Sequence, residues 1–434
     1  MITVIERIID EFHERPLPKL VRRERAITLL PGKAAVVLGM RRSGKTWLCY
    51  QHMEDLLAAG LPKERLLYLN FEDDRLSPLK VQDLDAILEA YFRRYPENKT
   101  QRCTFFLDEI QRVTGWEQFV RRMLDTENIS VVVTGSSSRM LSREIATCLR
   151  GRSYSTEVFP YSFREFMLCH QGGSAELDSH RWGSARRARV QHAAEQYLAI
   201  GGFPEVQHCT DEQRRQIVRN YVDVVLLRDV MERYGETNVT ALRALIHHCM
   251  SAPANRFSVT KFHHSLQSQG IACSKNTLYG NLEQLEDAYL LGRVPVYGRS
   301  AAVRRVNPDK LYASDVALAT AFRQPLAEGR GSLLENLAWC HLRGRGAELS
   351  HYLASDGTEV DFVYVDDAQG GVQLVQVCWS LREELTAERE VQSLKAAMRA
   401  LKVDKGVIVT WMEEANPCES ITAVPFWKWA ADRV

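Results

Sequence analysis

Short apolar runs alternate with helical stretches over the first third of the chain. The runs at 34–38, 66–71, 103–107 and 129–134 have the length and apolar content of strands buried on both faces of a sheet. Between them, apolar residues recur at helical spacing in 2–15, 47–59, 83–95 and 116–124. This alternation predicts an α/β core built on a parallel sheet.

The first apolar run opens into a glycine-bracketed loop that leads into a helix. The loop and the first helical residues read Gly39, Met40, Arg41, Arg42, Ser43, Gly44, Lys45, Thr46 and Trp47. Glycines let successive backbone N–H groups wrap an anion and the helix adds its positive N-terminal end, so the stretch predicts a phosphate-binding loop. Lys45 is expected on the β- and γ-phosphates of ATP, and the Thr46 hydroxyl on Mg²⁺. The alternative is a surface loop with a basic tip.

The run at 103–107 ends in Asp108 and Glu109, which is the pattern of a Walker B strand. Ligand groups gather at the carboxyl ends of parallel strands, so Asp108 is predicted to hold Mg²⁺, directly or through water. Glu109 is placed to orient or deprotonate the attacking water. In the alternative interpretation the two acids cap the next helix, but the phosphate loop favours the catalytic one.

Five further residues are candidates for contacting the nucleotide or its surroundings. Thr134 and Ser136 follow the strand at 129–134 and are candidate γ-phosphate sensors, unless the stretch is a turn that caps the next helix. Arg150 and Arg152 are candidate arginine fingers, in cis or from a neighbouring subunit, or solvated surface residues. Arg228 is a candidate lid sensor or a water-facing helical residue.

Composition and charge restrict the class of protein. The 434 residues are enough for two to four domains. A net charge of +1 gives no global signature of a polyanion-binding protein, so any nucleic-acid surface must be a local patch. The ten cysteines show no zinc spacing and suit reduced thiols, and we see no signal peptide or long apolar span. We therefore expect a cytoplasmic protein without a membrane partner.

Short motifs are spread along the chain. In the first part they lie at 39–46, 108–111 with Trp116, 134–138, 149–152 and 160–166, and in the second part at 201–205, 310–312 with Asp315, 334–336 and 359–362. Together they resemble the prokaryotic AAA-type ATPases that carry a C-terminal domain of unknown function. The resemblance covers nearly the whole chain. It implies a P-loop fold and the use of ATP, but no defined pathway. The expected division is an ATPase core at 1–180, a helical lid at 181–239, and further domains at 240–306 and 307–434.

The pattern at 240–306 predicts a winged helix. Ser274 caps a helix with an apolar face, and its exposed positions Lys275, Asn276 and Tyr279 could enter a major groove. Acidic residues on the same helix, Glu283, Glu286 and Asp287, oppose DNA, whereas Arg299, Arg304 and Arg305 favour it. Contact with a protein, or plain packing within the fold, therefore stays open beside contact with DNA.

The order of elements at 307–434 resembles the restriction-endonuclease-like fold. Glu335 and Asp361 match two acidic positions of that pattern, but Gln376 and Cys378 stand where the resemblance implies glutamate and lysine. An amide is a weaker Mg²⁺ ligand than a carboxylate, and a thiol does not supply the charge of a lysine. We therefore expect this part to be a scaffold without nuclease activity.

The sequence as a whole predicts an ATP-hydrolysing switch or motor that uses ATP and Mg²⁺. We expect a homo-oligomer that couples its nucleotide state to a DNA or protein partner through 240–306 and 307–434. Two alternatives remain: a non-catalytic ATP-sensing interaction module, and an ATP-regulated nuclease.

Overall fold

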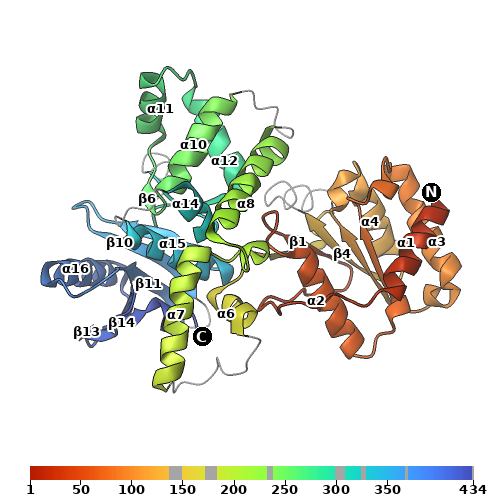
Figure 1. Cartoon of the computed structure of the whole chain (residues 1–434), viewed down its shortest axis with the longest axis horizontal. Helices are drawn as coiled ribbons and strands as arrows, with labels where there is room; N and C mark the ends of the chain where they lie inside the picture. The colour runs from red at the N-terminus through yellow and green to blue at the C-terminus, as the bar shows by residue number, and fades with distance from the viewer. Residues whose placement is uncertain are drawn as a thin grey trace. The chain divides into compact units, whose positions relative to one another are not determined.

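The structure is a computed structural model that describes residues 1–135, 149–171, 183–231, 238–298, 308–323, 329–366 and 370–432, without the side chains of 171 and 227–229. The chain divides into two compact units, Met1–Phe159 and Pro160–Val434 (Figure 1). The first unit ends before the expected boundary at residue 180. The second unit holds the three parts expected at 181–239, 240–306 and 307–434 within one compact body.

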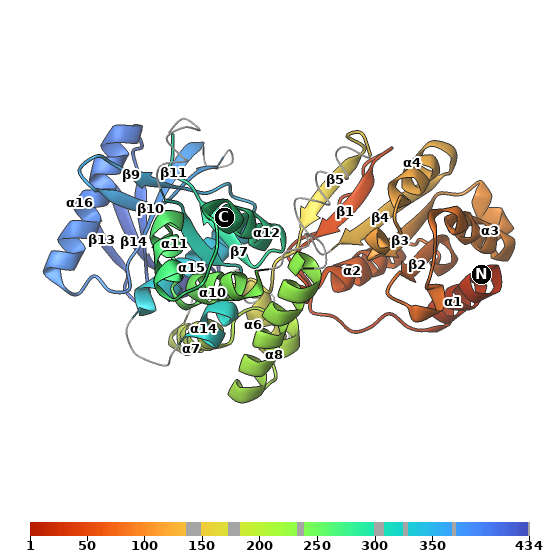
Figure 2. The ribbon, with the colours of Figure 1, turned by 90° about the horizontal axis from the view of Figure 1, so that it is seen from above.

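A five-stranded sheet forms the centre of the first unit. Its strands are β1 (Ala34–Leu38), β2 (Leu66–Asn70), β3 (Cys103–Asp108), β4 (Ile129–Gly135) and β5 (Ser153–Glu157). Their spatial order is β2-β3-β4-β1-β5, and every pairing is parallel. Helices α2 (Lys45–Ala58) and α4 (Trp116–Thr126) lie on opposite faces (Figure 2), and α1 (Ile2–Glu14) packs on α3 (Asp85–Arg94). The predicted parallel α/β core is confirmed.

Burial in this sheet follows the apolar pattern of the sequence. Every residue of β1, β3 and β4 is buried, because helices cover both faces. On one face, Val37, Phe106 and Val132 pack with Leu48 and Met53 of α2. The edge strand β5 is polar and mostly accessible. This packing brings the carboxyl ends of β1, β3 and β4 to one edge of the sheet, where ligands bind in open α/β folds.

The second unit begins with helices and a small antiparallel sheet. The first helices are α6 (Phe163–Gln171), α7 (Ser184–Ile200), α8 (Asp211–Val224) and a π-helix at Val225–Met231. The next elements are α10 (Val239–Ser251), β6 (Asn255–Arg256), α11 (Val259–Ser268), α12 (Lys275–Asp287), β7 (Leu291–Val294), β8 (Lys310–Ala313) and α14 (Val316–Phe322). The three strands lie in the order β6-β8-β7. Ser274 caps α12 by accepting a hydrogen bond from the Thr277 N–H, as the sequence predicts.

A six-stranded mixed sheet occupies the C-terminal end of the second unit. Its strands are β9 (Ser350–Leu353), β10 (Glu359–Asp366), β11 (Gly371–Val377), β12 (Gly406–Thr410), β13 (Ala415–Cys418) and β14 (Ile421–Pro425). They lie in the order β13-β14-β12-β11-β10-β9. The associated helices are α15 (Arg330–Gly344), α16 (Glu384–Leu401) and α17 (Phe426–Trp429). Val360, Leu374 and Ile408 form its core with Leu394 and Ala397 of α16.

The turn at 201–205 is fixed by the buried carboxylate of Asp315. The Gly202 N–H donates to Asp315 Oδ2 at 2.8 Å, and Asp315 Oδ1 accepts from the Ala317 N–H at the start of α14. A Cβ atom on Gly201 would lie 2.1 Å from Asp315 Oδ1, so only glycine fits there. Burial raises the pKa of Asp315 to about 7 against the effect of these hydrogen bonds. These motif residues therefore hold the second unit together.

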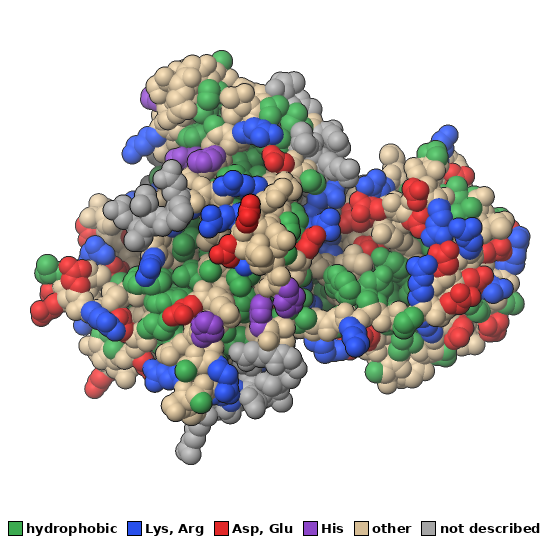
Figure 3. Space-filling view, in the orientation of Figure 1, with side chains coloured by type: hydrophobic (Ala, Val, Ile, Leu, Met, Phe, Trp, Pro, Cys, Tyr) green, Lys and Arg blue, Asp and Glu red, His purple; other side chains and the backbone are tan. Residues whose placement is uncertain are grey.

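On the face drawn in Figure 3, basic side chains (blue) and acidic side chains (red) are mixed, and no region of that face is dominated by one sign of charge. This distribution agrees with the net charge of +1. Among the described helices, none is long and apolar enough to cross a membrane.

Candidate active site

The predicted phosphate loop connects β1 to α2 at the carboxyl edge of the sheet. Gly39 has φ +149°, and a Cβ atom there would lie 2.2 Å from the Val158 carbonyl oxygen. Gly44, the N-cap of α2, has φ +100°. Both positions therefore require glycine, and the loop leads directly into the positive end of a helix of 14 residues. This is the backbone arrangement that binds phosphate in P-loop proteins.

Lys45 is buried inside the loop, with 6% of its surface exposed. Its ammonium donates to the carbonyl oxygens of Gly39 at 3.0 Å and Met40 at 3.1 Å. The Glu109 carboxylate lies 3.9 Å from the same nitrogen. The fold thus brings together the two residues that the sequence assigns to phosphate binding and to activation of water.

Asp108 is the centre of a hydroxyl network at the end of β3. Its Oδ2 atom accepts from Thr46 and from Tyr68, each at 2.8 Å, and its Oδ1 atom accepts from Thr134. Burial raises the pKa of Asp108, while the hydrogen bonds from Thr134, Tyr68 and Thr46 oppose the shift. Thr46 and Asp108, the two predicted Mg²⁺ ligands, are in direct contact.

Glu109 has a left-handed backbone conformation with φ +56°. Its N–H donates to Thr134 Oγ1 at 2.9 Å, and its Oε2 atom accepts from Gln111 Nε2 at 2.5 Å. Non-glycine residues rarely adopt positive φ, and such strain is concentrated at functional sites. Two contacts, one to the backbone and one to the carboxylate, therefore fix the orientation of Glu109.

The donor set of this edge fits a nucleotide with Mg²⁺. The Ser43 hydroxyl is buried in the loop and has no hydrogen-bond partner among the described residues. A buried hydroxyl without a partner is costly, and a phosphate oxygen would satisfy it. Thr46 and Asp108 supply the oxygen ligands that Mg²⁺ prefers. Within the described ranges of the chain as it stands, no group of three or more His, Cys, Asp or Glu side chains is arranged to hold a metal ion.

The remaining loop residues lie around this edge. Met40 is buried, whereas Arg42 and Trp47 are exposed. Arg41 lies 3.9 Å from Glu72, which also pairs with Arg112 at 2.7 Å. Arg41, Glu72 and Arg112 lie in the segments that follow β1, β2 and β3. Charged groups from the carboxyl ends of three strands therefore meet beside the phosphate loop.

The two candidate arginine fingers lie away from their own phosphate loop. Arg150 and Arg152 precede β5, and the Arg152 carbonyl accepts from the N–H of Ala34 at the start of β1. The two arginines therefore lie at the edge of the sheet where its strands begin. The five residues of β5 span about 16 Å between this edge and the carboxyl edge that carries the phosphate loop. Arg152 pairs there with Asp125. This geometry does not support a role in cis.

Two other candidates cannot be placed. Ser136 lies outside the described residues, and the side chain of Arg228, in the π-helix, is also outside them. Arg299, Arg304 and Arg305 of the expected winged helix are likewise outside. Their roles remain predictions.

Two residues of this site were missed from the sequence. Tyr68, which bonds Asp108, lies within an apolar run that indicates only a strand. Arg23 donates to the Ser43 carbonyl at 2.8 Å and to the Phe159 carbonyl at 2.5 Å, and its own N–H bonds Gln51. It therefore ties the phosphate loop to the end of the first unit.

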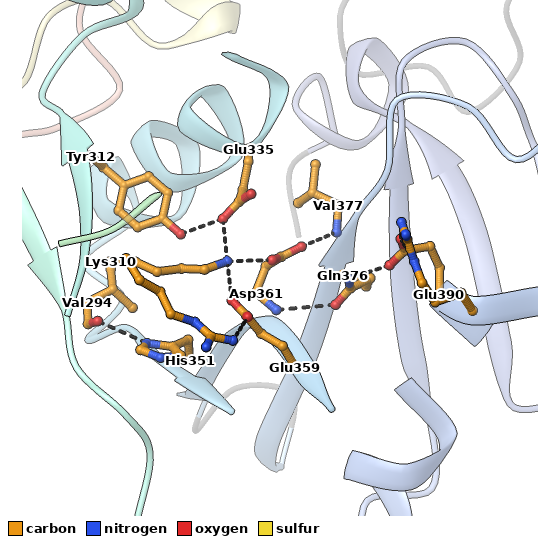
Figure 4. Close-up of polar contacts among 12 residues, drawn as sticks. Val294, Lys310, Tyr312, Glu335, His351, Glu359, Asp361, Gln376, Val377 and Glu390 are labelled. Carbon is orange, nitrogen blue, oxygen red and sulfur yellow. Dashed lines mark hydrogen bonds and ion pairs between the residues drawn. The ribbon is translucent and has the colours of Figure 1, made fainter. Parts of the chain in front are cut away.

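The acidic residues expected in the C-terminal part meet a lysine (Figure 4). Lys310 Nζ contacts Glu335 at 2.8 Å and Asp361 at 2.7 Å. Gln376 donates to Glu390 of α16 at 2.6 Å, and Cys378 is buried in the core formed with α16. The contact with Lys310 is not visible in the sequence.

Comparisons with known proteins agree with the geometry of the first unit. The model of an AAA domain matches residues 31–167, and that of a domain of unknown function (DUF8612) matches 191–327. The second match covers most of the expected lid and winged helix but ends before the C-terminal sheet.

Two curated relatives extend over most of the chain. The uncharacterized protein MJ1544 of Methanocaldococcus jannaschii is 32% identical over 440 residues, which cover 98% of this chain and 94% of the relative. An uncharacterized protein of Haemophilus influenzae is 28% identical over 76% of this chain and 78% of its own length.

Among solved structures, the Walker-type ATPase PABY2304 of Pyrococcus abyssi is 14% identical and has a TM-score of 0.44. The match covers 73% of this chain and 94% of that chain. The full-length similarity to MJ1544 and the matched AAA domain are the informative results. The chain therefore belongs to the family of MJ1544 and carries an AAA-type P-loop ATPase domain in its N-terminal part.

Proposed function

We propose that the first unit binds ATP with Mg²⁺ and hydrolyses it to ADP and phosphate. The observation that carries the proposal is the contact of Asp108 with the hydroxyls of Thr46, Tyr68 and Thr134. These contacts lie beside the glycine-bracketed loop at 39–46. Burial raises the pKa of Asp108, and carboxylates perturbed in this way are concentrated at functional sites. The matched AAA domain supports the same function.

Each residue of the edge would then have a separate role. The backbone N–H groups of 39–46 would hold the phosphates, and Lys45 would neutralise their charge. Thr46 and Asp108 would hold Mg²⁺, which stabilises negative charge on the transferred phosphoryl group. Glu109, fixed by Gln111, would orient the attacking water and accept its proton. We assign Thr134 to positioning Asp108, because its hydroxyl hydrogen points to that carboxylate.

We further propose that the nucleotide state is coupled to a macromolecular partner through the second unit. Its order α10-β6-α11-α12-β7-β8, with an antiparallel sheet, supports a winged helix. On α12, Lys275 and Asn276 are exposed, and Tyr279 is 48% exposed. Glu286, which opposes DNA in the sequence, pairs with Arg293 at 2.8 Å, so its charge is compensated. This observation favours DNA as the first partner to test.

DNA binding is tested by measuring the affinity for duplex DNA at several salt concentrations. Contact through α12 predicts that Lys275→Ala reduces the salt dependence and that Tyr279→Ala weakens binding. Equal affinity for wild type and both variants would direct the search to a protein partner.

The ATPase proposal is tested by measuring phosphate release from ATP in Mg²⁺. Lys45→Ala should abolish nucleotide binding, because it removes the cation of the loop. Glu109→Gln should keep binding but slow turnover by about a hundredfold or more. Lys33→Ala, which changes an exposed lysine just before β1, is the matched control. Binding without turnover in wild type would favour the non-catalytic ATP-sensing alternative.

A further inference from the structure

The C-terminal half contains a lysine surrounded by three carboxylates. Lys310 Nζ on β8 lies 2.8 Å from Glu335 Oε1 on α15, 2.7 Å from Glu359 Oε1 and 2.7 Å from Asp361 Oδ1, both on β10 (Figure 4). An ammonium group has three N–H donors. Glu335 and Asp361 accept hydrogen bonds from this ammonium, and Glu359 completes the set as an ion pair.

The other oxygens of these carboxylates are largely engaged as well. Glu359 Oε2 accepts from Arg256 on β6, and Asp361 Oδ2 accepts from the Val377 N–H at 2.8 Å. Glu335 Oε1 also accepts from the Tyr312 hydroxyl at 2.7 Å. Five of the six carboxylate oxygens are thus already in contact with donors of the chain itself.

The charges within this cluster nearly balance. Lys310 is 5% exposed, and two cations, Lys310 and Arg256, face the three acids. Burial lowers the pKa of Lys310, but Asp361, Glu335 and Glu359 outweigh this effect and the pKa is raised. Burial and the neighbouring Asp361 raise the pKa of Glu335, while Lys310 and Tyr312 oppose the shift. The cluster's own cations therefore compensate most of its negative charge.

A neighbouring strand carries the two residues that replace the expected glutamate and lysine. Gln376 accepts from the Asp361 N–H at 3.2 Å and donates to Glu390, so its amide is committed to the fold. Cys378 is buried among apolar residues, and burial raises the pKa of its thiol to about 11. Neither side chain is available as a metal ligand or as a catalytic cation.

We propose that Glu335, Glu359 and Asp361 form a cation site whose resident cation is the Lys310 ammonium, so that a divalent metal ion enters only when this ammonium is removed. The ammonium joins β8 to the C-terminal sheet and replaces the metal that a nuclease would require. The inference is independent of the proposed ATPase function, since it concerns residues of the second unit alone.

The test is to titrate the full chain with Mn²⁺ in the absence of nucleotide and to count bound ions by electron paramagnetic resonance. Wild type and Asp361→Asn should bind the same number of Mn²⁺ ions. Lys310→Met, which keeps the length of the side chain but removes its charge, should bind one additional ion per chain. The double variant Lys310→Met/Asp361→Asn should lose that ion again. Differences between variants cancel any Mn²⁺ that binds at Asp108.

Two results would overturn the proposal. One is an ion bound by wild type that Asp361→Asn lacks, which would show that a metal enters beside Lys310. The other is a folded Lys310→Met variant that gains no ion. Should Lys310→Met fail to fold, Lys310→Gln gives the same comparison with a polar side chain, and the comparison of wild type with Asp361→Asn still decides whether a metal enters beside Lys310.

Discussion

Replacing Tyr68 by phenylalanine tests whether the hydroxyl network around Asp108 prepares a Mg²⁺ site. The change removes one hydroxyl and keeps the ring, which packs against Tyr50 and Phe12. The lost contact is a 2.8 Å hydrogen bond to a carboxylate that is 2% exposed. Hydrogen bonds to charged groups contribute about 1.5–3 kcal/mol, which corresponds to roughly 10- to 100-fold.

We expect this loss to appear in the affinity for Mg²⁺, because residues that orient a metal ligand typically change metal affinity by about 10- to 100-fold. The assay is phosphate release at fixed ATP over a range of Mg²⁺ concentrations. Tyr68→Phe should shift the half-saturating Mg²⁺ concentration upwards by that factor and recover most of its rate at saturation.

Tyr91→Phe is the matched control. The Tyr91 hydroxyl donates to the neutral carbonyl of Glu64 at 2.7 Å in the same unit. Its removal should lower stability without changing the requirement for Mg²⁺. An unchanged half-saturating Mg²⁺ concentration in Tyr68→Phe would refute the assigned role of Tyr68. An equal increase of that concentration in Tyr91→Phe would refute it as well.

Three further predictions concern cleavage, assembly and acid stability. Linear, circular and single-stranded DNA, and RNA, should stay intact in Mg²⁺ or Mn²⁺ with ATP; cleavage that Asp361→Ala abolishes would contradict this. ATP trapped by Glu109→Gln should favour an oligomer in sedimentation velocity, and Arg152→Ala should weaken this oligomer if Arg152 completes a neighbour's site. A monomer at micromolar protein would leave Arg150 and Arg152 without a catalytic role. Burial lowers the pKa of His351 from 6.5 to about 4, so protonation of the ring disfavours the folded state and about 3 kcal/mol of stability is lost as the pH falls from 6.5 towards 4. His351→Phe should flatten the fall in Tm over this range, and an equally steep fall would contradict the assignment.

The sequence predicted the core of the first unit because its chemistry lies in contiguous motifs. The loop at 39–46 and the pair Asp108 and Glu109 each follow a buried apolar strand, and strand direction alone brings them to one edge. Tyr68 could not be predicted in the same way. An aromatic residue in an apolar run is expected in the core, and only the pairing of β2 with β3 places its hydroxyl on Asp108.

The sequence left a role in cis open for the candidate fingers for a related reason. The strand that follows Arg150 and Arg152, Ser153–Glu157, is polar and was not recognised as part of the sheet. Residues before a parallel strand lie at the edge opposite the ligand site, so recognising β5 would have excluded a role in cis.

The environment of Lys310 depends on contacts between distant parts of the chain. Its partners lie 25 and 51 positions away, on a helix and on another strand. Spacing within the sequence identified Glu335 and Asp361 as a pair of acids, but it could not show that a third element neutralises them.

The most direct test of the ATPase assignment is the amount of unhydrolysed ATP that remains bound to the purified protein after incubation with Mg²⁺ and labelled ATP. The account predicts mainly ADP on wild type, about one ATP per site on Glu109→Gln, and no nucleotide on Lys45→Ala. Equal conversion of ATP to ADP by wild type and Glu109→Gln would contradict the central role of Glu109, and undiminished binding by Lys45→Ala would contradict the phosphate loop itself.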